Sequence, residues 1–415
     1  MGKAIYVLVA GLVLMFVYGC KKDDAAKDAF KLEKYPPVAI AKQNGQKVFV
    51  HYMTWFETKE TNGNNTWGMH WTMGNKNPDV TDQQGKREIA SHFYPLIGPY
   101  ASGDKDVVEY HLLLMKYAGI DGVMVDWYGT HDVYDYAKIR ANTEAVAEML
   151  GKVGLELSIV YEDRTTNAVV EQGKASSNVI AAKEDMLYLQ SNFFAKPYYA
   201  KINGQPLLLV FGPGVLQTES EWTSVFSPIN PKPWLLTLWN ELQDAGRNAK
   251  GEYAWVYMDQ THLSDFYDSR VPNVNFSIGS AYPGFVDFYT EGGWPDDIHW
   301  TIPHNNGATL DETLQMSSDA GIDYLQLVTW NDFGEGTIIE PTSEFGFGYL
   351  DKIKAHTQVS GANGAFELIH RLYDLRKKHK AGATIQKQLD QVFYFLASLQ
   401  TEKANELLAS IENTD

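Results

Sequence analysis

Short apolar runs recur along the chain and alternate with longer stretches of helical spacing. The runs are rich in Val, Leu and Ile and too short for helices, so they predict buried strands. They lie at residues 47–53, 122–127, 155–161, 206–211, 233–239, 254–258, 274–278 and 324–329. Apolar residues three and four positions apart predict amphipathic helices between them, at 106–117, 141–153, 178–190 and 309–319.

The alternation of strands and helices predicts the fold class. Strands that alternate with helices form parallel sheets, and about eight such units form a closed (β/α)8 TIM barrel, here expected over residues 38–357. The alternative is an open, doubly wound sheet. Neither a Gly-x-Gly-x-x-Gly turn after the first strand nor a Gly-Lys-Ser/Thr loop occurs, which counts against the nucleotide-binding forms of that sheet.

The N-terminal segment differs from the barrel in composition. Residues 1–19 carry one charge, Lys3, and an apolar run that is short for a membrane span, so they predict a signal peptide. Cys20, the only cysteine, follows directly and resembles the lipidated Cys of bacterial lipoproteins, with residues 20–37 as its tether and linker. We therefore expect an exported protein anchored to a membrane, at the outer membrane and cell surface or on the periplasmic face. The alternative is an ordinary signal peptide followed by an unmodified Cys.

The C-terminal segment, residues 361–415, begins with a break at 361–364 that has a glycine at each end. Apolar spacing predicts helices at 366–379 and 389–411, which would form a short helical extension packed on the barrel or against a partner. A basic cluster ends the first of these helices, where positive charge suits the helix dipole.

Composition narrows the range of partners. The 415 residues are 44% hydrophobic and 21% charged, which is ordinary for a globular protein with one large core. A net charge of −17 disfavours binding to nucleic acids or acidic polysaccharides. Aromatic residues make up 13% of the chain, which suits the stacking of sugar rings, although a Tyr-rich core would also account for it.

The ends of the predicted strands hold the candidate site, because barrel active sites form at the C-terminal ends of the strands. The histidines have no spacing typical of metal ligands, and no Cys nucleophile or Gly-x-Ser-x-Gly elbow occurs, so neither a metal nor a cofactor is expected. The side chains that the rule selects are His51, Tyr52, Trp55, Asp126, Trp127, Tyr128, Tyr161, Glu162, Asp163, Arg164, Tyr282, Trp330, Asn331, Asp332 and Glu335.

Asp332 and Glu335 are the strongest candidates for chemistry. They lie three residues apart in a Gly-containing loop directly after the last buried strand. Two carboxylates are costly to desolvate there, and general acid/base catalysis is the use that needs them. Trp330 and Phe333 flank the pair, and aromatic surface beside paired acids is typical of a saccharide cleft. The alternative is a solvated loop whose acids cap the next helix.

Several motifs resemble one group of enzymes. The segment Trp-Asn-Asp-Phe-Gly-Glu-Gly-Thr-Ile-Ile-Glu-Pro at 330–341 resembles the last-strand motif of glycoside hydrolase families 71 and 99. Both are (β/α)8 barrels; family 71 contains α-1,3-glucanases, and family 99 contains endo-acting α-mannosidases and α-mannanases. Val-Asp-Trp-Tyr-Gly at 125–129, Tyr-Glu-Asp-Arg at 161–164 and Ala-Tyr-Pro-Gly-Phe at 281–285 are similar to segments of family 99.

The resemblance implies roles for these residues. Asp332 and Glu335 correspond to the catalytic pair, with Glu335 as general acid, and Glu162 to a Glu that contacts the sugar. In family 99 the first acid is a Glu that deprotonates the 2-hydroxyl; Asp332 is one methylene shorter, as in family 71, and could act through a water instead. The stereochemical outcome therefore stays open. The expected substrate-binding residues are Tyr52, Trp55, Asp126, Trp127, Glu162, Tyr282, Trp330 and Asn331.

The expected function is a glycoside hydrolase that cleaves an α-linked neutral glycan, endo-acting on α-mannan first and an α-1,3-glucanase second. Two alternatives remain: an exo-acting pentosidase, and a catalytically inactive glycan-binding lipoprotein on the same barrel. A closed pocket would favour exo-action and an open groove endo-action. The intact acids Asp332 and Glu335 argue against the inactive form.

Overall fold

The computed structural model describes Met1 and residues 30–63, 65–295, 298–361 and 363–413. Cys20 and the rest of the expected signal peptide lie outside these residues, so lipidation stays a prediction. None of the helices in the described ranges combines the length and apolar character that a membrane span requires.

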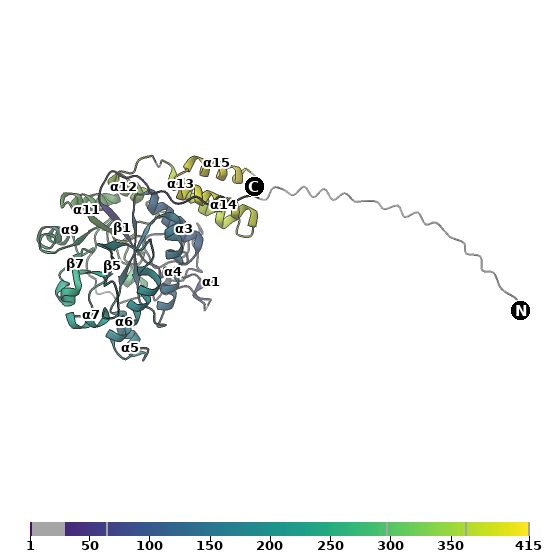
Figure 1. The fold of residues 1–415 in the computed structure, drawn as a ribbon. Helices are drawn as coiled ribbons and strands as arrows, with labels where there is room; N and C mark the ends of the chain where they lie inside the picture. Colours follow the sequence, from purple (N-terminus) through teal and green to yellow (C-terminus); the bar gives the residue numbers. More distant parts are fainter. Residues whose placement is uncertain (2–29, 64, 296–297, 362, 414–415) are drawn as a thin grey trace. The chain divides into compact units, whose positions relative to one another are not determined.

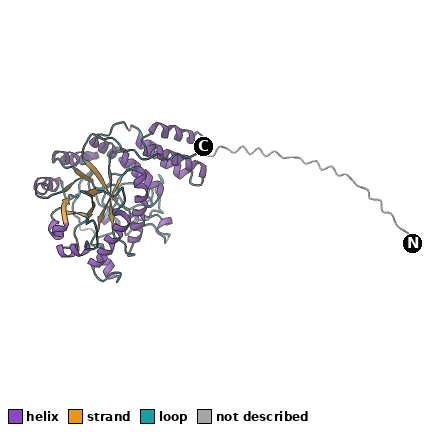
Figure 2. Ribbon diagram, in the orientation of Figure 1, coloured by secondary structure: helices purple, strands orange, loops and turns teal. Residues whose placement is uncertain are grey.

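The described chain contains a closed barrel of parallel strands (Figures 1 and 2). The barrel strands are β1 (Lys47–Tyr52), β2 (Gly122–Trp127), β3 (Glu156–Tyr161), β5 (Gln205–Val210), β6 (Trp234–Leu238), β7 (Ala249–Tyr253), β8 (Ser277–Ala281) and β9 (Tyr324–Leu327). They pair in this order, and β9 closes the barrel by pairing with β1. A short strand, β4 (Lys201–Ile202), adds to β5 in antiparallel fashion. The predicted (β/α)8 barrel is therefore confirmed.

Helices surround the barrel, as Figure 2 shows. The longer ones are α3 (Lys105–Tyr117), α4 (Tyr136–Val153), α6 (Asn178–Leu189), α11 (Ala308–Asp319) and α12 (Gly348–Thr357). The shorter ones include α5 (Thr165–Glu171), α7 (Glu219–Val225), α9 (Gln260–Asp265) and α10 (Tyr289–Gly292). The four helices predicted within the barrel correspond to α3, α4, α6 and α11.

Alternation along each strand separates two layers of core. Phe49 of β1 and Met124 of β2 belong to the cluster inside the barrel, whereas Val50, Tyr52 and Trp127 belong to the cluster between strands and helices. Successive side chains of a strand point to opposite faces, so this parity continues to the strand ends. It decides which of the last residues of a strand face the mouth of the barrel.

Two predicted strands were placed wrongly. The expected strands at 254–258 and 274–278 correspond to β7 and β8, which lie at Ala249–Tyr253 and Ser277–Ala281. Strand β7 carries Glu252, so a search for apolar runs passes over it. Glu252 is fully buried because Arg270 binds it, with Nη2 and Oε1 2.6 Å apart. A buried charge that has a partner is the reason the apolar rule failed here.

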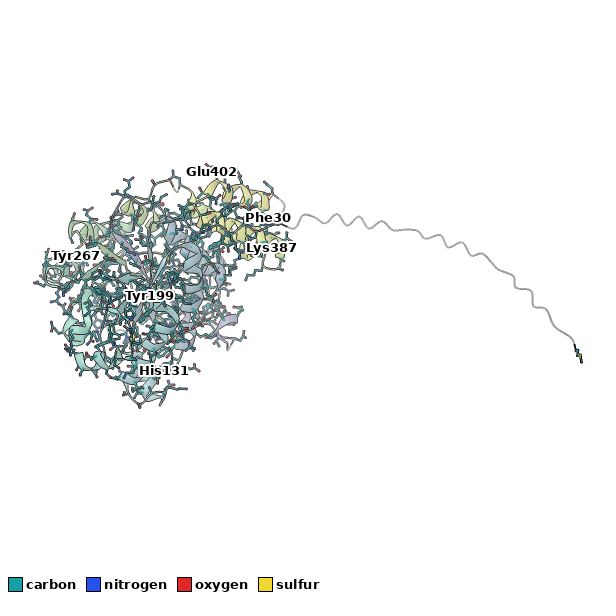
Figure 3. The ribbon with its side chains drawn as sticks, viewed as in Figure 1. Phe30, His131, Tyr199, Tyr267, Lys387 and Glu402 are labelled. Carbon is teal, nitrogen blue, oxygen red and sulfur yellow. The ribbon has the colours of Figure 1, made fainter. Side chains whose placement is uncertain are left out.

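The C-terminal extension consists of α13 (Ala365–Lys378), α14 (Ala383–Ala397) and α15 (Thr401–Glu412). Lys387 of α14 and Glu402 of α15 are labelled in Figure 3. The predicted helix at 389–411 is wrong as a single element, because Leu399 has a φ of 60° and the helix breaks there. Left-handed backbone cannot continue an α-helix.

Charged and polar contacts join the extension to helix α3 of the barrel and to Glu33, which precedes the barrel in sequence. Arg376 and Glu109 of α3 are both almost fully buried, with Nη2 and Oε2 2.9 Å apart. Arg376 also pairs with Asp390 at 2.7 Å. The backbone N–H of Glu33 donates to Gln391 Oε1 at 2.7 Å, so Glu33 lies on α14. An ion pair buried this deeply needs both partners in place.

Candidate active site

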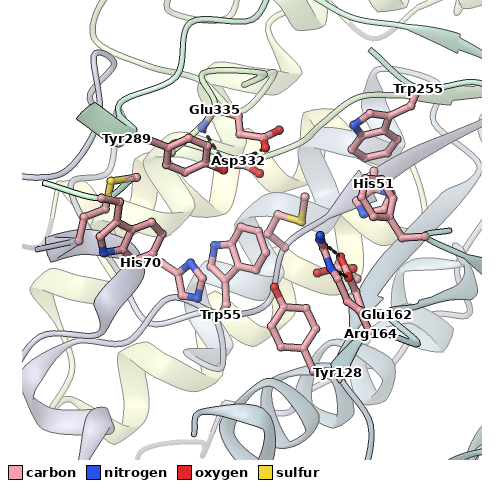
Figure 4. Close-up of a pocket in the computed structure, with 16 residues that line it drawn as sticks. His51, Trp55, His70, Tyr128, Glu162, Arg164, Trp255, Tyr289, Asp332 and Glu335 are labelled. Carbon is pink, nitrogen blue, oxygen red and sulfur yellow. Dashed lines mark hydrogen bonds and ion pairs between the residues drawn. The ribbon is translucent and has the colours of Figure 1, made fainter. Parts of the chain in front are cut away.

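A cavity of about 170 Å³ lies at the C-terminal ends of the strands, where a barrel carries its active site (Figure 4). Its wall combines carboxylic acids with aromatic rings. The lining residues are His51, Met53, Trp55, His70, Met73, Asp126, Tyr128, Glu162, Arg164, Phe211, Trp255, Tyr289, Trp294, Asp332, Gly334 and Glu335.

Asp332 and Glu335 both line this cavity, in the loop that follows β9. The Asp332 backbone N–H donates to Thr329 Oγ1 at 2.8 Å, and Asp332 Oδ1 accepts from the Glu335 backbone N–H at 3.0 Å. These two hydrogen bonds close a compact turn, and both acids of the turn face the same cavity. The hydroxyl of Tyr289 donates to Glu335 Oε1 at 3.0 Å, as the dashed line in Figure 4 shows.

The two acids titrate over different ranges. Burial raises the pKa of Asp332 to about 6, while backbone N–H groups of the turn and nearby His70 act in the opposite direction. Burial and then the charge of Asp332 raise the pKa of Glu335 to about 8, against the hydrogen bond from Tyr289. At neutral pH Asp332 is therefore ionised and Glu335 protonated, which is the division that acid/base catalysis by two carboxyl groups requires.

Asn331 lies behind this loop and not in the cavity wall. Its side-chain amide forms two hydrogen bonds with the backbone of Met53. Oδ1 accepts from the Met53 N–H and Nδ2 donates to the Met53 carbonyl, both at 2.9 Å. Nδ2 also donates to the hydroxyl of Tyr100, which donates to Glu340 Oε2 at 2.6 Å. His111 Nε2 lies 3.1 Å from Glu340 Oε1. The expectation that Asn331 contacts substrate is not met; Asn331 joins the loop of Asp332 and Glu335 to Met53, the residue after β1.

Asp126 and Glu162 face the same cavity from the ends of β2 and β3. Burial and the neighbouring Glu162 raise the pKa of Asp126 well above its usual range. Burial also raises the pKa of Glu162, although Arg164 opposes this. Arg164 binds both Glu162 oxygens, with Nη2 3.0 Å from Oε1. Both acids thus lie in the cavity wall, where the sequence predicts hydroxyl-binding groups, and they share this wall with the cation Arg164.

Tyr128, one of the strand-end candidates, lines the cavity. Of the five aromatic residues expected to bind substrate, Trp55 lines it too, and it stacks on His70 with ring centres 4.3 Å apart. The remaining four, Tyr52, Trp127, Tyr282 and Trp330, are fully buried and lie outside the cavity wall.

Each of these four packs in the core. Tyr52 and His111 Nδ1 form a hydrogen bond of 2.9 Å, and Trp330 packs against the same His111. Trp127 stacks on Tyr188 of α6. Tyr282 packs among the apolar residues under α9 and α11. The expectation that these four residues shape the cleft was wrong. For Tyr52 and Trp127 the reason is strand alternation, because the neighbours His51 and Asp126 face the cavity instead.

The sequence analysis missed several residues of the wall. Trp255 lies two positions beyond β7, but the misplaced strand put it inside an element. Tyr289 and Trp294 belong to the segment between β8 and α11, where no strand end pointed to them. His70 belongs to α2 (Met69–Thr72) in the long connection after β1. Met53, Met73, Phe211 and Gly334 complete the group that was missed.

His51 is neutral in this cavity, since burial lowers its pKa to about 3, opposed by Gln326. Trp255 packs edge-on against it, with ring centres 4.6 Å apart. Within the described ranges, no group of three His, Cys, Asp or Glu side chains is arranged to hold a metal ion.

Comparison with known proteins extends these observations. Residues 44–232 match the model of glycosyl hydrolase family 99. A glycoprotein endo-α-1,2-mannosidase-like protein of Danio rerio is 20% identical over 71% of this chain and 70% of its own length. A protein of the same description from Mus musculus is 28% identical over 61% of this chain and 58% of its own length.

Solved structures show the same fold. The GH99 endo-α-mannosidase from Bacteroides thetaiotaomicron superposes with a TM-score of 0.58 at 18% identity, over 74% of this chain and 96% of that one. The fold, the paired acids and these relatives define the protein as a glycoside hydrolase. The chain is similar to glycoside hydrolase family 99 over residues 44–232 and to the endo-α-1,2-mannosidase-like relative of Danio rerio over a longer stretch. The residues that match the family model end before Asp332 and Glu335, so the geometry of the cavity carries the assignment of those two acids.

Proposed function

We propose that the protein hydrolyses an α-linked neutral glycan and acts within chains of α-mannan. The observation that carries the proposal is the pair Asp332 and Glu335, buried in one aromatic-walled cavity with their pKa values raised to about 6 and about 8. A pair of carboxyl groups in opposite protonation states is what glycosidic cleavage requires.

Glu335 is the general acid in this proposal. Its Oε1 already accepts a hydrogen bond from Tyr289, so Oε2 carries the proton toward the glycosidic oxygen. Once the proton has been transferred, the Tyr289 hydroxyl stabilises the carboxylate that remains. This contact helps Glu335 to act as an acid at neutral pH.

Asp332 is the base. The backbone N–H of Glu335 holds its Oδ1, and burial keeps its carboxylate poorly solvated and therefore basic. It accepts the proton of the sugar 2-hydroxyl or of an attacking water. The anomeric form of the first product, read by NMR, distinguishes the two routes because they give retention and inversion respectively.

The neutral, mannose-type substrate rests on two observations. The cavity wall holds the acids Asp126, Glu162, Asp332 and Glu335 and the single Arg164, whose guanidinium is bound by Glu162, so an anionic sugar would be repelled. The relatives from Danio rerio and Bacteroides thetaiotaomicron carry endo-mannosidase names. In this proposal Asp126 and Glu162 bind sugar hydroxyls.

The experiment is hydrolysis of a panel of α-mannans and α-glucans by the purified protein, with product sizing. Oligosaccharides released from α-mannan, abolished in Asp332→Asn, would support the proposal. Single sugars released from chain ends would show exo-action, and binding without products would show an inactive glycan-binding protein.

An α-glucanase is the second candidate, and one observation favours it. The first acid of the pair is Asp332, the residue type that family 71 resemblance implies at this position. The same panel decides between the two, since cleavage of α-1,3-glucan with α-mannan untouched would select the second candidate.

We also propose that Cys20 is lipidated and anchors the enzyme on the outside of the cell. The support is the sequence alone: an apolar run ends directly before this single Cys, and Lys21-Lys-Asp-Asp24 follows it. An anchored enzyme of this kind would act on polymeric glycans close to the membrane.

A further inference from the structure

The aromatic wall of the cavity continues outward along one loop. Tyr128 lines the cavity, and its ring meets that of Tyr136 edge-on with centres 5.3 Å apart. Tyr136 in turn meets Tyr134, with ring centres 5.9 Å apart. Tyr134 is 74% exposed, the most exposed aromatic side chain of the described barrel. Tyr136 is buried, so it links the two rings by packing while Tyr134 meets solvent.

The loop that carries Tyr134 is held on both sides. Asp135 binds His70 Nε2 at 3.3 Å, and His70 stacks on Trp55 in the cavity wall. At the other end, the backbone N–H and hydroxyl of Thr130 both donate to Asp185 Oδ1 at 2.7 Å. A loop tied down at both ends keeps the Tyr134 ring at the rim with little loss of freedom when a ligand binds.

The backbone at Tyr134 is also unusual. Its φ is 49°, in the left-handed region that side chains other than Gly rarely adopt. This backbone conformation costs free energy, and the contact with Tyr136 still leaves most of a large ring exposed to water. A ligand that covers the ring would compensate for the exposed apolar surface.

We propose that Tyr134, supported from beneath by the buried Tyr136, forms a distal subsite that binds the glycan chain beyond the cavity by stacking on a sugar ring. Its ligand is a neutral saccharide long enough to reach from the cavity across Tyr128 to the rim. The inference rests on the proposed function and deepens it, because a subsite outside the cavity is useful to an enzyme that acts within a chain.

The test compares Tyr134→Ala with Tyr134→Phe on two substrates, polymeric α-mannan and the shortest α-mannoside that the wild type cleaves. Tyr134→Ala should lower kcat/KM on the polymer about two- to tenfold, the scale of one aromatic contact, and leave the short substrate unchanged. Tyr134→Phe keeps the ring face and should retain wild-type values. Thermal unfolding of both variants should match the wild type, because the side chain is exposed.

Each other outcome has a distinct meaning. If Tyr134→Ala cleaves the polymer as well as the wild type does, or loses equally on both substrates, the distal subsite is refuted while the proposed function stands. If the wild type cleaves neither α-mannan nor the short mannoside, the proposed function fails first, and the subsite fails with it.

Discussion

Two sets of aromatic side chains stand at the ends of the barrel strands and differ in what they contact. Trp55, Tyr128 and Trp255 line the cavity beside the acids. Trp127 and Trp330 stand one position away from cavity or loop residues, yet both are fully buried in the layer between strands and helices. Position near a strand end is therefore a poor guide to function, because it selects both sets equally.

Strand alternation explains the difference at the ends of β1 and β2. Phe49 and His51 point into the barrel, so Tyr52 must point outward; Met124 and Asp126 point inward, so Trp127 points outward. The alternation of a strand carries this information, and the first inward residue can be read from the sequence once the strand is placed.

Trp127→Ala should show the largest effect on stability. Removing a fully buried Trp leaves a cavity, and such changes cost about 3–5 kcal/mol in free energy of unfolding. Chemical denaturation measures the loss, and kcat/KM of the remaining folded protein should stay near the wild-type value. A variant that unfolds normally but no longer uses substrate would reverse the assignment of Trp127 to the core.

Trp255→Ala is the matched change in the cavity wall. The Trp255 ring lines the cavity and packs on His51. Its loss should therefore lower kcat/KM by an amount equivalent to about 1–2 kcal/mol of transition-state stabilisation. The free energy of unfolding should fall less than in Trp127→Ala. Kinetics and denaturation of the two Trp variants, measured side by side, test the comparison. Equal stability losses with unchanged kinetics in both would remove the distinction between the two sets.

The dependence of kcat/KM on pH should follow the two acids. Below a pH of about 6 Asp332 becomes protonated and the base is lost; above about 8 Glu335 loses its proton and the acid is lost. The profile should be bell-shaped, with a fall of about tenfold per pH unit outside these limits. Asp332→Asn should remove the acidic limb from whatever activity remains. A flat profile from pH 5 to 9 would contradict the assignment.

The sequence predicted the barrel and the two acids because both leave local signals. Apolar runs mark most strands, and Asp332 and Glu335 share one loop. Tyr289 and His70 left no such signal, since they reach the cavity from segments without a strand end. Strand β7 escaped because Glu252 is neutralised by Arg270, a partner that only the fold brings close.

Cys20→Ala should have the smallest effect on catalysis. If Cys20 carries the lipid, the native protein partitions with membranes and the variant does not, while kcat/KM on a soluble substrate is unchanged. Fractionation followed by an activity assay of both fractions measures this. A wild-type protein that is recovered entirely in the soluble fraction after export would exclude the anchor.

The most direct test of the central claim is Glu335→Gln, measured for both hydrolysis and binding of an α-mannan oligosaccharide. The change removes the proton donor and keeps the shape of the side chain and the hydrogen bond from Tyr289. We predict a rate loss of at least ~10²-fold with the oligosaccharide still bound. Hydrolysis by Glu335→Gln at a rate near that of the wild type would contradict the role of Glu335 as the general acid.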